Sequence, residues 1–530
     1  MIFGVWPERL TVAGLIATAV VLYSSFSWGL PASRYNSPDE AANAYFAGRL
    51  AQGQTLAAPV PLNNKLPAPI IHPRSTVVVQ GNLVPASFLG WPLLAGAWGR
   101  IFGAGWLPFL TPLGAILGLL CFYSIIRELF DRRTAVISTM LLVFLPAYWY
   151  YHARSLFHNA LFFDLLLASA WFMLQSLRQQ KSWYYLGAGL AVGLAVAVRT
   201  SEIFWILSSG LLWLVLSWRQ VKPRYLPLLG LGALLGFAPV LWANYAVYGQ
   251  VLSVGYRAGL KFPLSDLRAT TSLLGELILP FGFHPRAILS NTYNYLLGLS
   301  WWWAVLATGG LAWLLARWRG LSSEQRAFTL KGFLACLWLV VLYGSWSFHD
   351  NPDPQAITLG TSYVRYWLPL YAFLLWPAGA FLSWLWGLKA GWLRAAVAGL
   401  VGVYTILSFT LVFYDPQEGL LKIRANIKRF EQVGRAVQQA TEPESVIVSG
   451  NTEKNYWPER QEIVSLLNPS DYQTVRQLLE AGTPVYRFHP TWSPPDLRYM
   501  NERQLAQAGL KLAPVRLGFE DHSLYKFLPL

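Results

Sequence analysis

The sequence predicts an α-helical protein that crosses a membrane about eleven times and ends in a small α/β domain. Of its 530 residues, 55% are hydrophobic and 13% are charged, whereas soluble domains carry about 25% charged residues. Apolar runs long enough to cross a hydrocarbon core of ~30 Å recur between residues 10 and 414. The sequence after residue 414 becomes rich in charge of both signs, which predicts a separate C-terminal domain.

Eleven apolar segments are expected to span the membrane. They lie at residues 10–30, 105–126, 134–151, 155–177, 183–198, 201–218, 225–246, 296–316, 330–347, 366–386 and 395–414. The first has a weakly charged start and exceeds the usual apolar core of a signal peptide, so we interpret it as a retained helix and not a cleaved one. Residues 86–102 are also apolar, but a span there would reverse every later loop. We therefore expect a helix along the outer membrane interface.

The basic residues predict the orientation. Residues 415–530 hold 14 basic and 14 acidic residues and are neutral. A further 14 basic residues lie in five short loops, at residues 127–133, 178–181, 219–224, 317–331 and 389–394. Because positive residues concentrate in cytoplasmic loops, the N-terminus is expected inside, and an odd number of spans puts the tail outside. The basic excess therefore marks topology and does not indicate nucleic-acid binding.

The expected organisation is a transmembrane domain over residues 1–414 and an extracytoplasmic domain over residues 415–530. Three longer segments of the first domain should lie outside, at residues 31–104, 247–295 and 348–365. In the tail, helical segments alternate with strand-like ones, at residues 420–440, 445–449, 472–481, 484–487, 502–508 and 510–517. This alternation predicts a small α/β fold.

An acidic pair follows the first span. Ser37, Pro38 and Glu40 have the pattern of a capping box with proline at the first helical position, which predicts a helix start. Capping accounts for Ser37 and Glu40 but does not require Asp39. A carboxylate just beyond a membrane span is a candidate general base. The residues alone leave a structural and a catalytic interpretation of Asp39 open.

A first span followed by an Asp-Glu pair that opens a juxtamembrane helix resembles the GT-C membrane glycosyltransferases, such as protein O-mannosyltransferases and lipid A aminoarabinose transferases. The resemblance covers roughly residues 10–220 and 360–385. It is carried, in order, by residues 83–85, 102–105, 127–133, 145–148, 153–154, 189–200 and 363–369. The chain departs from the family after Arg154, where many relatives carry an acid; here Asp164 lies deeper in the next span.

The resemblance implies an inverting transferase that moves a sugar from a polyprenyl-phosphate donor to an extracytoplasmic protein, lipid or glycan acceptor. Asp39 would take the acceptor's proton, while Glu40 would cap and orient its helix. Substrate-binding roles are implied for Tyr45, Arg154, His158, Asn159, Arg199, Arg365 and Tyr366. Arginine suits a phosphate because its planar fork meets two oxygens at once. No cofactor is expected with certainty, and a divalent metal is left open, with His349, Asp350 and Asp353 as weak candidate ligands.

Structural interpretations stand beside these roles. Arg199 and Arg365 could snorkel from helix ends to the interface, and Arg154 with His158 could form a local polar cluster. If the first two do not bind phosphate, the second long loop offers Arg257, Lys261 and Arg268. For the whole chain, the alternatives are a transporter or flippase of lipid-linked sugars and a non-catalytic envelope scaffold. We expect a multi-pass plasma-membrane protein.

Overall fold

The computed structural model describes residues 5–253, 255, 279–348, 353, 355–464, 469–519 and 521–530. The chain forms two compact units. The first, which we call the helical unit, comprises Met1–Trp28, Pro108–Val240 and Phe262–Lys422. The second, which we call the mixed unit, comprises Gly29–Leu107, Leu241–Lys261 and Ile423–Leu530. Each unit is therefore assembled from segments that are distant in the sequence.

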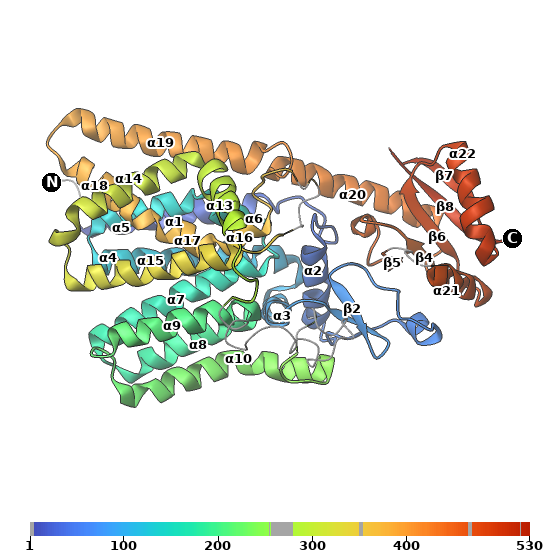
Figure 1. Cartoon of the computed structure of the whole chain (residues 1–530), viewed down its shortest axis with the longest axis horizontal. Coiled ribbons are helices and arrows are strands. Elements are labelled where there is room, and N and C mark those ends of the chain that lie inside the picture. Colours follow the sequence, from blue (N-terminus) through green and yellow to red (C-terminus); the bar gives the residue numbers. More distant parts are fainter. Residues whose placement is uncertain are drawn as a thin grey trace. The chain divides into compact units, whose positions relative to one another are not determined.

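The helical unit consists of apolar helices, most of which run alongside one another (Figure 1). They are α1 (Val5–Ser25), α4 (Leu110–Leu129), α5 (Arg132–Val143), α6 (Pro146–Arg154), α7 (His158–Gln179), α8 (Ser182–Val198), α9 (Ile203–Ser217), α10 (Leu226–Tyr248), α13 (Pro285–Asn291), α14 (Trp301–Arg317), α15 (Ser323–Gly344), α16 (Ser362–Tyr366), α17 (Leu368–Phe373), α18 (Leu375–Gly387) and α19 (Gly391–Tyr414). This confirms the predicted polytopic helical fold.

Within the described residues, seven helical stretches are long and apolar enough to cross a membrane, and one of them joins α17 and α18. Two further spans are bent pairs of helices, and α8 is a shorter apolar helix of 17 residues. Helix α8 packs closely on α10, because a Cβ on Gly189 would lie 2.0 Å from the Leu229 carbonyl oxygen. Small residues at such spacing let membrane helices approach each other. Each predicted span therefore coincides with a helix, although α1 and α8 are not among the seven stretches that are long and apolar enough to cross a membrane.

The apolar segment at residues 86–102 forms α3 (Gly90–Phe102), a helix of 13 residues in the mixed unit. This helix is shorter than the ~20 residues that a membrane span needs, which fits the expectation of an interfacial helix.

Two predicted spans are wrong in detail. The span expected at residues 134–151 is the pair α5 and α6, bent by 55°. Leu145 is extended at the bend because it precedes Pro146, whose ring disfavours a helical residue before it. The span expected at residues 296–316 begins later, at Trp301, because the preceding helical segment Pro285–Gly298 turns away by 97°.

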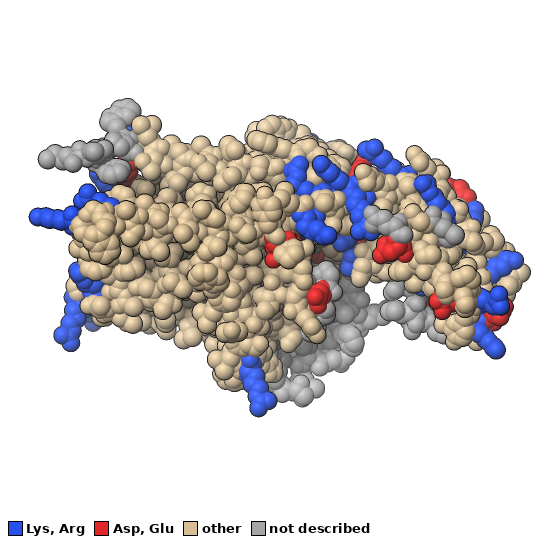
Figure 2. Space-filling model, turned by 90° about the horizontal axis from the view of Figure 1, so that it is seen from above, with Lys and Arg blue, Asp and Glu red and all other residues tan. Residues whose placement is uncertain are grey.

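Basic loops meet at one end of the helical unit. Arg178 pairs with Glu128 at 3.1 Å and with Glu324 at 3.0 Å, which joins three of the predicted cytoplasmic loops. Glu8, near the N-terminus, pairs at the same end with Arg127 at 3.1 Å. Figure 2 shows a broad surface without charged residues over the helices, with Lys and Arg gathered at the left end of the view. This is the charge pattern of a membrane protein.

The mixed unit contains two sheets and the helices that cover them. Its elements are α2 (Pro38–Ala51), β1 (Ala58–Pro59), η1 (Pro61–Lys65), β2 (Thr76–Val79), β3 (Asn82–Pro85), α3, α20 (Leu420–Ala440), β4 (Val446–Val448), η8 (Glu453–Asn455), β5 (Gln461–Ile463), α21 (Pro469–Glu480), β6 (Val485–Pro490), α22 (Pro494–Tyr499), η9 (Met500–Leu505), η10 (Ala506–Ala508), β7 (Leu510–Phe519) and β8 (His522–Pro529). Strands β1, β3 and β2 form an antiparallel sheet in that order.

The C-terminal sheet has the order β5-β4-β6-β8-β7. Strand β4 is parallel to β5 and β6, and β8 is antiparallel to both its neighbours. The predicted alternation of helix and strand is confirmed, although β5 and β8 were not expected. Ile71 from the first long segment is buried in the same core as Val446 and Phe527. The first long segment and the tail therefore share one hydrophobic core, which the predicted domain boundaries did not anticipate.

Helices α2 and α3 pack tightly within the mixed unit. A Cβ on Gly96 would lie 2.5 Å from the Leu50 Cβ, and one on Gly99 would lie 3.0 Å from the Ala51 Cβ. Beyond this contact, Ile101, Phe102 and Trp106 are more than half exposed. An exposed apolar end of this kind fits the predicted helix at the membrane interface, and the packing holds α2 against it.

The orientation can be tested with single cysteines. Native Cys121 and Cys336 are buried, so they give little background. An impermeant maleimide added to intact cells should label Gln477→Cys, in the exposed part of α21, and spare Arg319→Cys in the basic loop after α14. The physical reason is the retention of basic loops in the cytoplasm. Permeabilised cells should label both variants, and the reverse pattern in intact cells would contradict the orientation.

Candidate active site

The acidic pair opens α2 as the sequence predicted. Ser37 is the N-cap, its hydroxyl accepts from the Asp39 backbone N–H at 3.3 Å, and Pro38 occupies the first turn. The Glu40 carboxylate accepts from the Ser37 backbone N–H at 2.9 Å, which completes a capping box. The predicted capping role of Glu40 is confirmed.

The carboxylates of Asp39 and Glu40 differ in their exposure to solvent. Glu40 is 3% exposed, while Asp39 is half-buried. The Ser75 hydroxyl donates a hydrogen bond of 2.6 Å to Asp39 Oδ1. Of the two, Asp39 is therefore the more accessible carboxylate, and the hydrogen bond from Ser75 holds it in a defined orientation.

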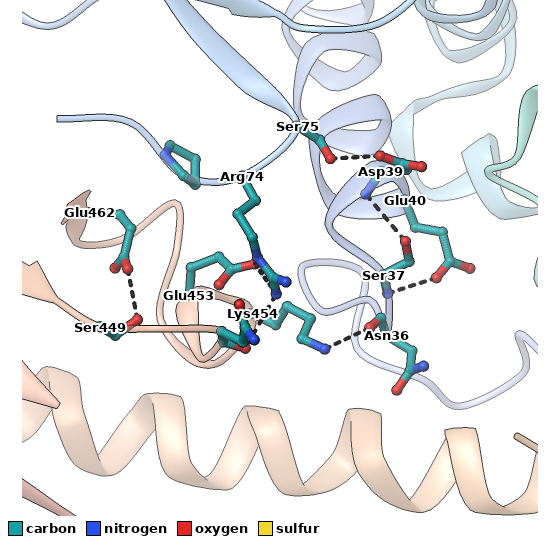
Figure 3. Close-up of polar contacts among 12 residues, drawn as sticks. Asn36, Ser37, Asp39, Glu40, Arg74, Ser75, Ser449, Glu453, Lys454 and Glu462 are labelled. Carbon is teal, nitrogen blue, oxygen red and sulfur yellow. Dashed lines mark hydrogen bonds and ion pairs between the residues drawn. The ribbon is translucent and has the colours of Figure 1, made fainter. Parts of the chain in front are cut away.

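The C-terminal segment around η8 contacts the chain at the start of α2 (Figure 3). Lys454 Nζ donates to the Asn36 carbonyl at 2.9 Å, one residue before the N-cap. Glu453 forms an ion pair of 2.7 Å with Arg74, one residue before Ser75. No local pattern predicts these contacts, because their partners lie several hundred residues apart.

Arg34 adds a buried anchor just before α2. It is 3% exposed, donates to the Trp457 carbonyl at 3.0 Å and pairs with Glu459 at 2.9 Å. Tyr45, predicted to bind substrate, packs its ring on Trp457 with centroids 4.6 Å apart. Tyr45 thus joins α2 to the same C-terminal segment, and its substrate role stays a prediction.

In the helical unit, three predicted arginines come together. Arg154 ends α6, Arg199 follows α8, and Arg365 lies in α16. Asn159 links two of them, since its side chain accepts from Arg199 at 3.2 Å and donates to the Arg365 carbonyl at 3.3 Å. We call Arg154, Arg199, Arg365 and Asn159 the arginine cluster.

Aromatic rings complete the cluster. The guanidinium carbons of Arg154 and Arg365 lie 4.8 and 5.4 Å from the Phe157 ring centroid. Those of Arg199 and Arg365 lie 4.1 and 5.4 Å from the Tyr366 ring. These cation–π contacts stabilise buried positive charge without neutralising it. Phe157 was not among the predicted site residues.

The three arginines have different polar partners. Arg199 pairs with the buried Glu202, which also accepts from the Trp205 indole. Arg154 donates to the Tyr150 hydroxyl at 2.8 Å, and Arg365 donates to the Ser362 hydroxyl at 2.6 Å. Glu202 was not predicted as a counter-ion, although its position three residues after Arg199 is a recognisable signal.

The cluster creates a positive potential at Tyr366, which precedes the span that begins at Leu368. Burial acts to raise the pKa of its phenol, but the charges of Arg199 and Arg365 outweigh burial and leave the pKa below the usual value for tyrosine. An environment that favours the phenolate also favours other anions, such as a phosphate.

Two further polar residues, Asp164 and His158, lie on α7. Asp164 is fully buried, accepts from the Tyr148 hydroxyl at 2.9 Å and lies 2.9 Å from His152 Nε2. It therefore ties α7 to α6 as part of the helical packing. His158 is 6% exposed at the first residue of α7, next to Asn159. Its predicted role in substrate binding stays a prediction.

Among the described residues, no group of three or more His, Cys, Asp and Glu side chains is placed to hold a metal ion. Asp353 is exposed. The other weak metal candidates and the alternative phosphate ligands lie outside the described residues: Arg257, Lys261, Arg268, His349 and Asp350.

Residues 100–242 match the model of a family described as dolichyl-phosphate-mannose-protein mannosyltransferase. ArnT from Cupriavidus metallidurans bound to undecaprenyl phosphate has a similar structure, with a TM-score of 0.61 at 13% identity over 97% of each chain. Its apo state gives 0.59 at 14% identity, again over 97% of each chain. An apo oligosaccharyltransferase from Archaeoglobus fulgidus gives 0.49 at 12% identity, over 94% of this chain and 71% of that chain. No match to the chain is found among curated proteins.

The family match covers the region from α3 to α10, and this region contributes Arg154 and Arg199 to the arginine cluster. The shared fold covers nearly all of both chains, including the C-terminal domain. Sequence match and fold agree with the resemblance inferred from the order of motifs. Residues 100–242 therefore resemble the mannosyltransferase family, and the chain as a whole shares the fold of ArnT.

Proposed function

We propose that this protein transfers a monosaccharide from a polyprenyl-phosphate donor to a hydroxyl or amine acceptor on the outer side of the plasma membrane. The observation that carries the proposal is the arginine cluster at the ends of apolar helices, in which Arg154 and Arg199 are buried and Arg365 is half-buried. A lipid phosphate sits at the depth where such helix ends lie. The similarity to ArnT, whose structure contains undecaprenyl phosphate, supports the choice of donor class.

The arginine cluster is the proposed phosphate site. Its guanidinium groups stay charged at any accessible pH and can each offer two parallel N–H donors to phosphate oxygens. Contacts with Asn159, Phe157 and Tyr366 hold them in place before substrate arrives. Such preorganised charge stabilises a transition state in which negative charge develops on the departing phosphate.

Asp39 is the proposed general base. In the transfer step, the Asp39 carboxylate takes the proton of the acceptor O–H or N–H. The acceptor atom then bonds to the anomeric carbon from the side opposite the phosphate. The bond from that carbon to the phosphate oxygen breaks, and its electron pair leaves with the polyprenyl phosphate. The sugar is thereby transferred with inversion.

The base can be tested with a matched pair of variants. Asp39→Asn should lower kcat by roughly 10²–10⁴-fold, the usual contribution of a general base. Glu40→Gln keeps the capping box, because glutamine serves the same position, and should retain most of the activity. The measurement is turnover of radiolabelled polyprenyl-phosphate sugar by purified protein, with thermal melting to verify folding. Normal turnover by Asp39→Asn would remove Asp39 as the base.

The phosphate site can be tested with arginine variants. Arg365→Ala and Arg199→Ala should each weaken donor binding about ten- to a hundredfold, the size of a charge-assisted hydrogen bond. Arg365→Lys should stay impaired, because a point charge cannot replace the bidentate fork. Arg286→Ala, at an exposed arginine of the same unit, is the control and should bind normally.

Binding of polyprenyl phosphate and release of the sugar should be measured separately. Movement of label across the membrane without cleavage of the sugar–phosphate bond would point to a flippase instead. Wild-type donor binding by both alanine variants would show that Arg365 and Arg199 merely snorkel to the interface.

A further inference from the structure

Ser75 has a backbone conformation that needs an explanation. Its φ is +59°, in the left-handed region that non-glycine residues seldom adopt. Its hydroxyl donates to Asp39 Oδ1 at 2.6 Å. Strained residues of this kind persist where the surrounding structure fixes them, and they concentrate at functional sites.

Neighbouring contacts fix Ser75 from both sides. Its carbonyl accepts from the Ala86 N–H at 3.1 Å, and Thr76 pairs with Pro85 in the β2–β3 ladder. On the other side, Arg74 binds Glu453 through two nitrogens, at 2.8 and 2.7 Å. The Glu453 side chain is 3% exposed, so this ion pair is shielded from water on one side.

A second serine holds the Asp39 backbone. Ser37 Oγ accepts from the Asp39 N–H at 3.3 Å. The residue before Ser37 is Asn36, whose carbonyl accepts from Lys454 at 2.9 Å. The two serines that contact Asp39 are thus each preceded by a residue that binds the C-terminal segment, and the two anchors, Glu453 and Lys454, are consecutive in η8 (Figure 3).

We propose that Glu453 and Lys454 of the C-terminal domain position the Asp39 carboxylate, acting through Arg74–Ser75 and Asn36–Ser37. The proposal rests on the assignment of Asp39 as the general base. Glu453, Lys454 and Ser75 are positioning residues, since they act on Asp39 and not on the substrate. The C-terminal domain is accordingly part of the catalytic machinery and not an appendage to it.

The role of the Ser75 hydroxyl in positioning Asp39 can be tested with the variant Ser75→Gly. Glycine adopts a positive φ at no steric cost, so this variant should fold at least as stably as the wild type. Loss of the hydroxyl should lower kcat by roughly ten- to a hundredfold, the size of a hydrogen bond to a charged group. The KM for donor should not change, because the phosphate site is untouched.

Gln80→Gly is the matched control. Gln80 is also a non-glycine residue at positive φ (+50°), it is exposed, and it lies in the turn between β2 and β3 of the same sheet. This variant should behave as wild type. Equal kcat values for Ser75→Gly and Gln80→Gly, with Asp39→Asn inactive, would overturn the positioning role of Ser75 while leaving the proposed function intact.

The link to the C-terminal domain is tested by Glu453→Gln, with Glu480→Gln in an exposed pair on α21 as control. Glu453→Gln should lower kcat and leave the KM for donor unchanged, in a protein whose melting curve still shows one folded state. In the double variant Glu453→Gln/Ser75→Gly the two losses should not multiply, because both act through one connection. Losses that multiply, or a normal kcat in Glu453→Gln, would overturn the link.

Discussion

The placement of charge in this chain follows from the free energy needed to take an ion out of water. That cost is several kcal/mol per ion even after the protein relaxes, and a buried ion pair offsets it only with good geometry. Basic residues therefore stay in the loops at one end of the helices, where Arg178 meets Glu128 and Glu324. Arg199 enters the interior together with Glu202. Arg154 is buried as well, where it donates to the Tyr150 hydroxyl, and a bound anion would offset the cost of its charge.

Much of the fold was predictable because the membrane imposes a length and a composition. A span needs about 20 apolar residues, so the membrane helices could be located from hydropathy. In the C-terminal domain, helix α20 has the predicted bounds. The start of α2 was predictable because Ser37, Pro38 and Glu40 form a local capping pattern. The arginines of the candidate site were predicted because each stands at a helix end, a position that the motifs of the resemblance also mark.

The remaining features depend on contacts that no local pattern encodes. The bend at Leu145 comes from one proline inside an otherwise continuous apolar run, and β5 has three residues, too few to show an alternating pattern. The supports of Asp39 could not be foreseen for the same reason. Ser75 is an ordinary serine in the sequence, and Lys454 contacts Asn36 from a position 418 residues away. Which side chains converge is decided by tertiary packing.

That separation also sets an order of events during synthesis. Asn36 leaves the ribosome early, but its hydrogen bond waits until Lys454 has been made and has reached the same side of the membrane. Arg34 likewise waits for Glu459. A chain interrupted before η8 carries α2 and Asp39 without Glu453 and Lys454. The contacts that hold the start of α2 are therefore completed only after Lys454, 418 residues beyond Asn36, has been made.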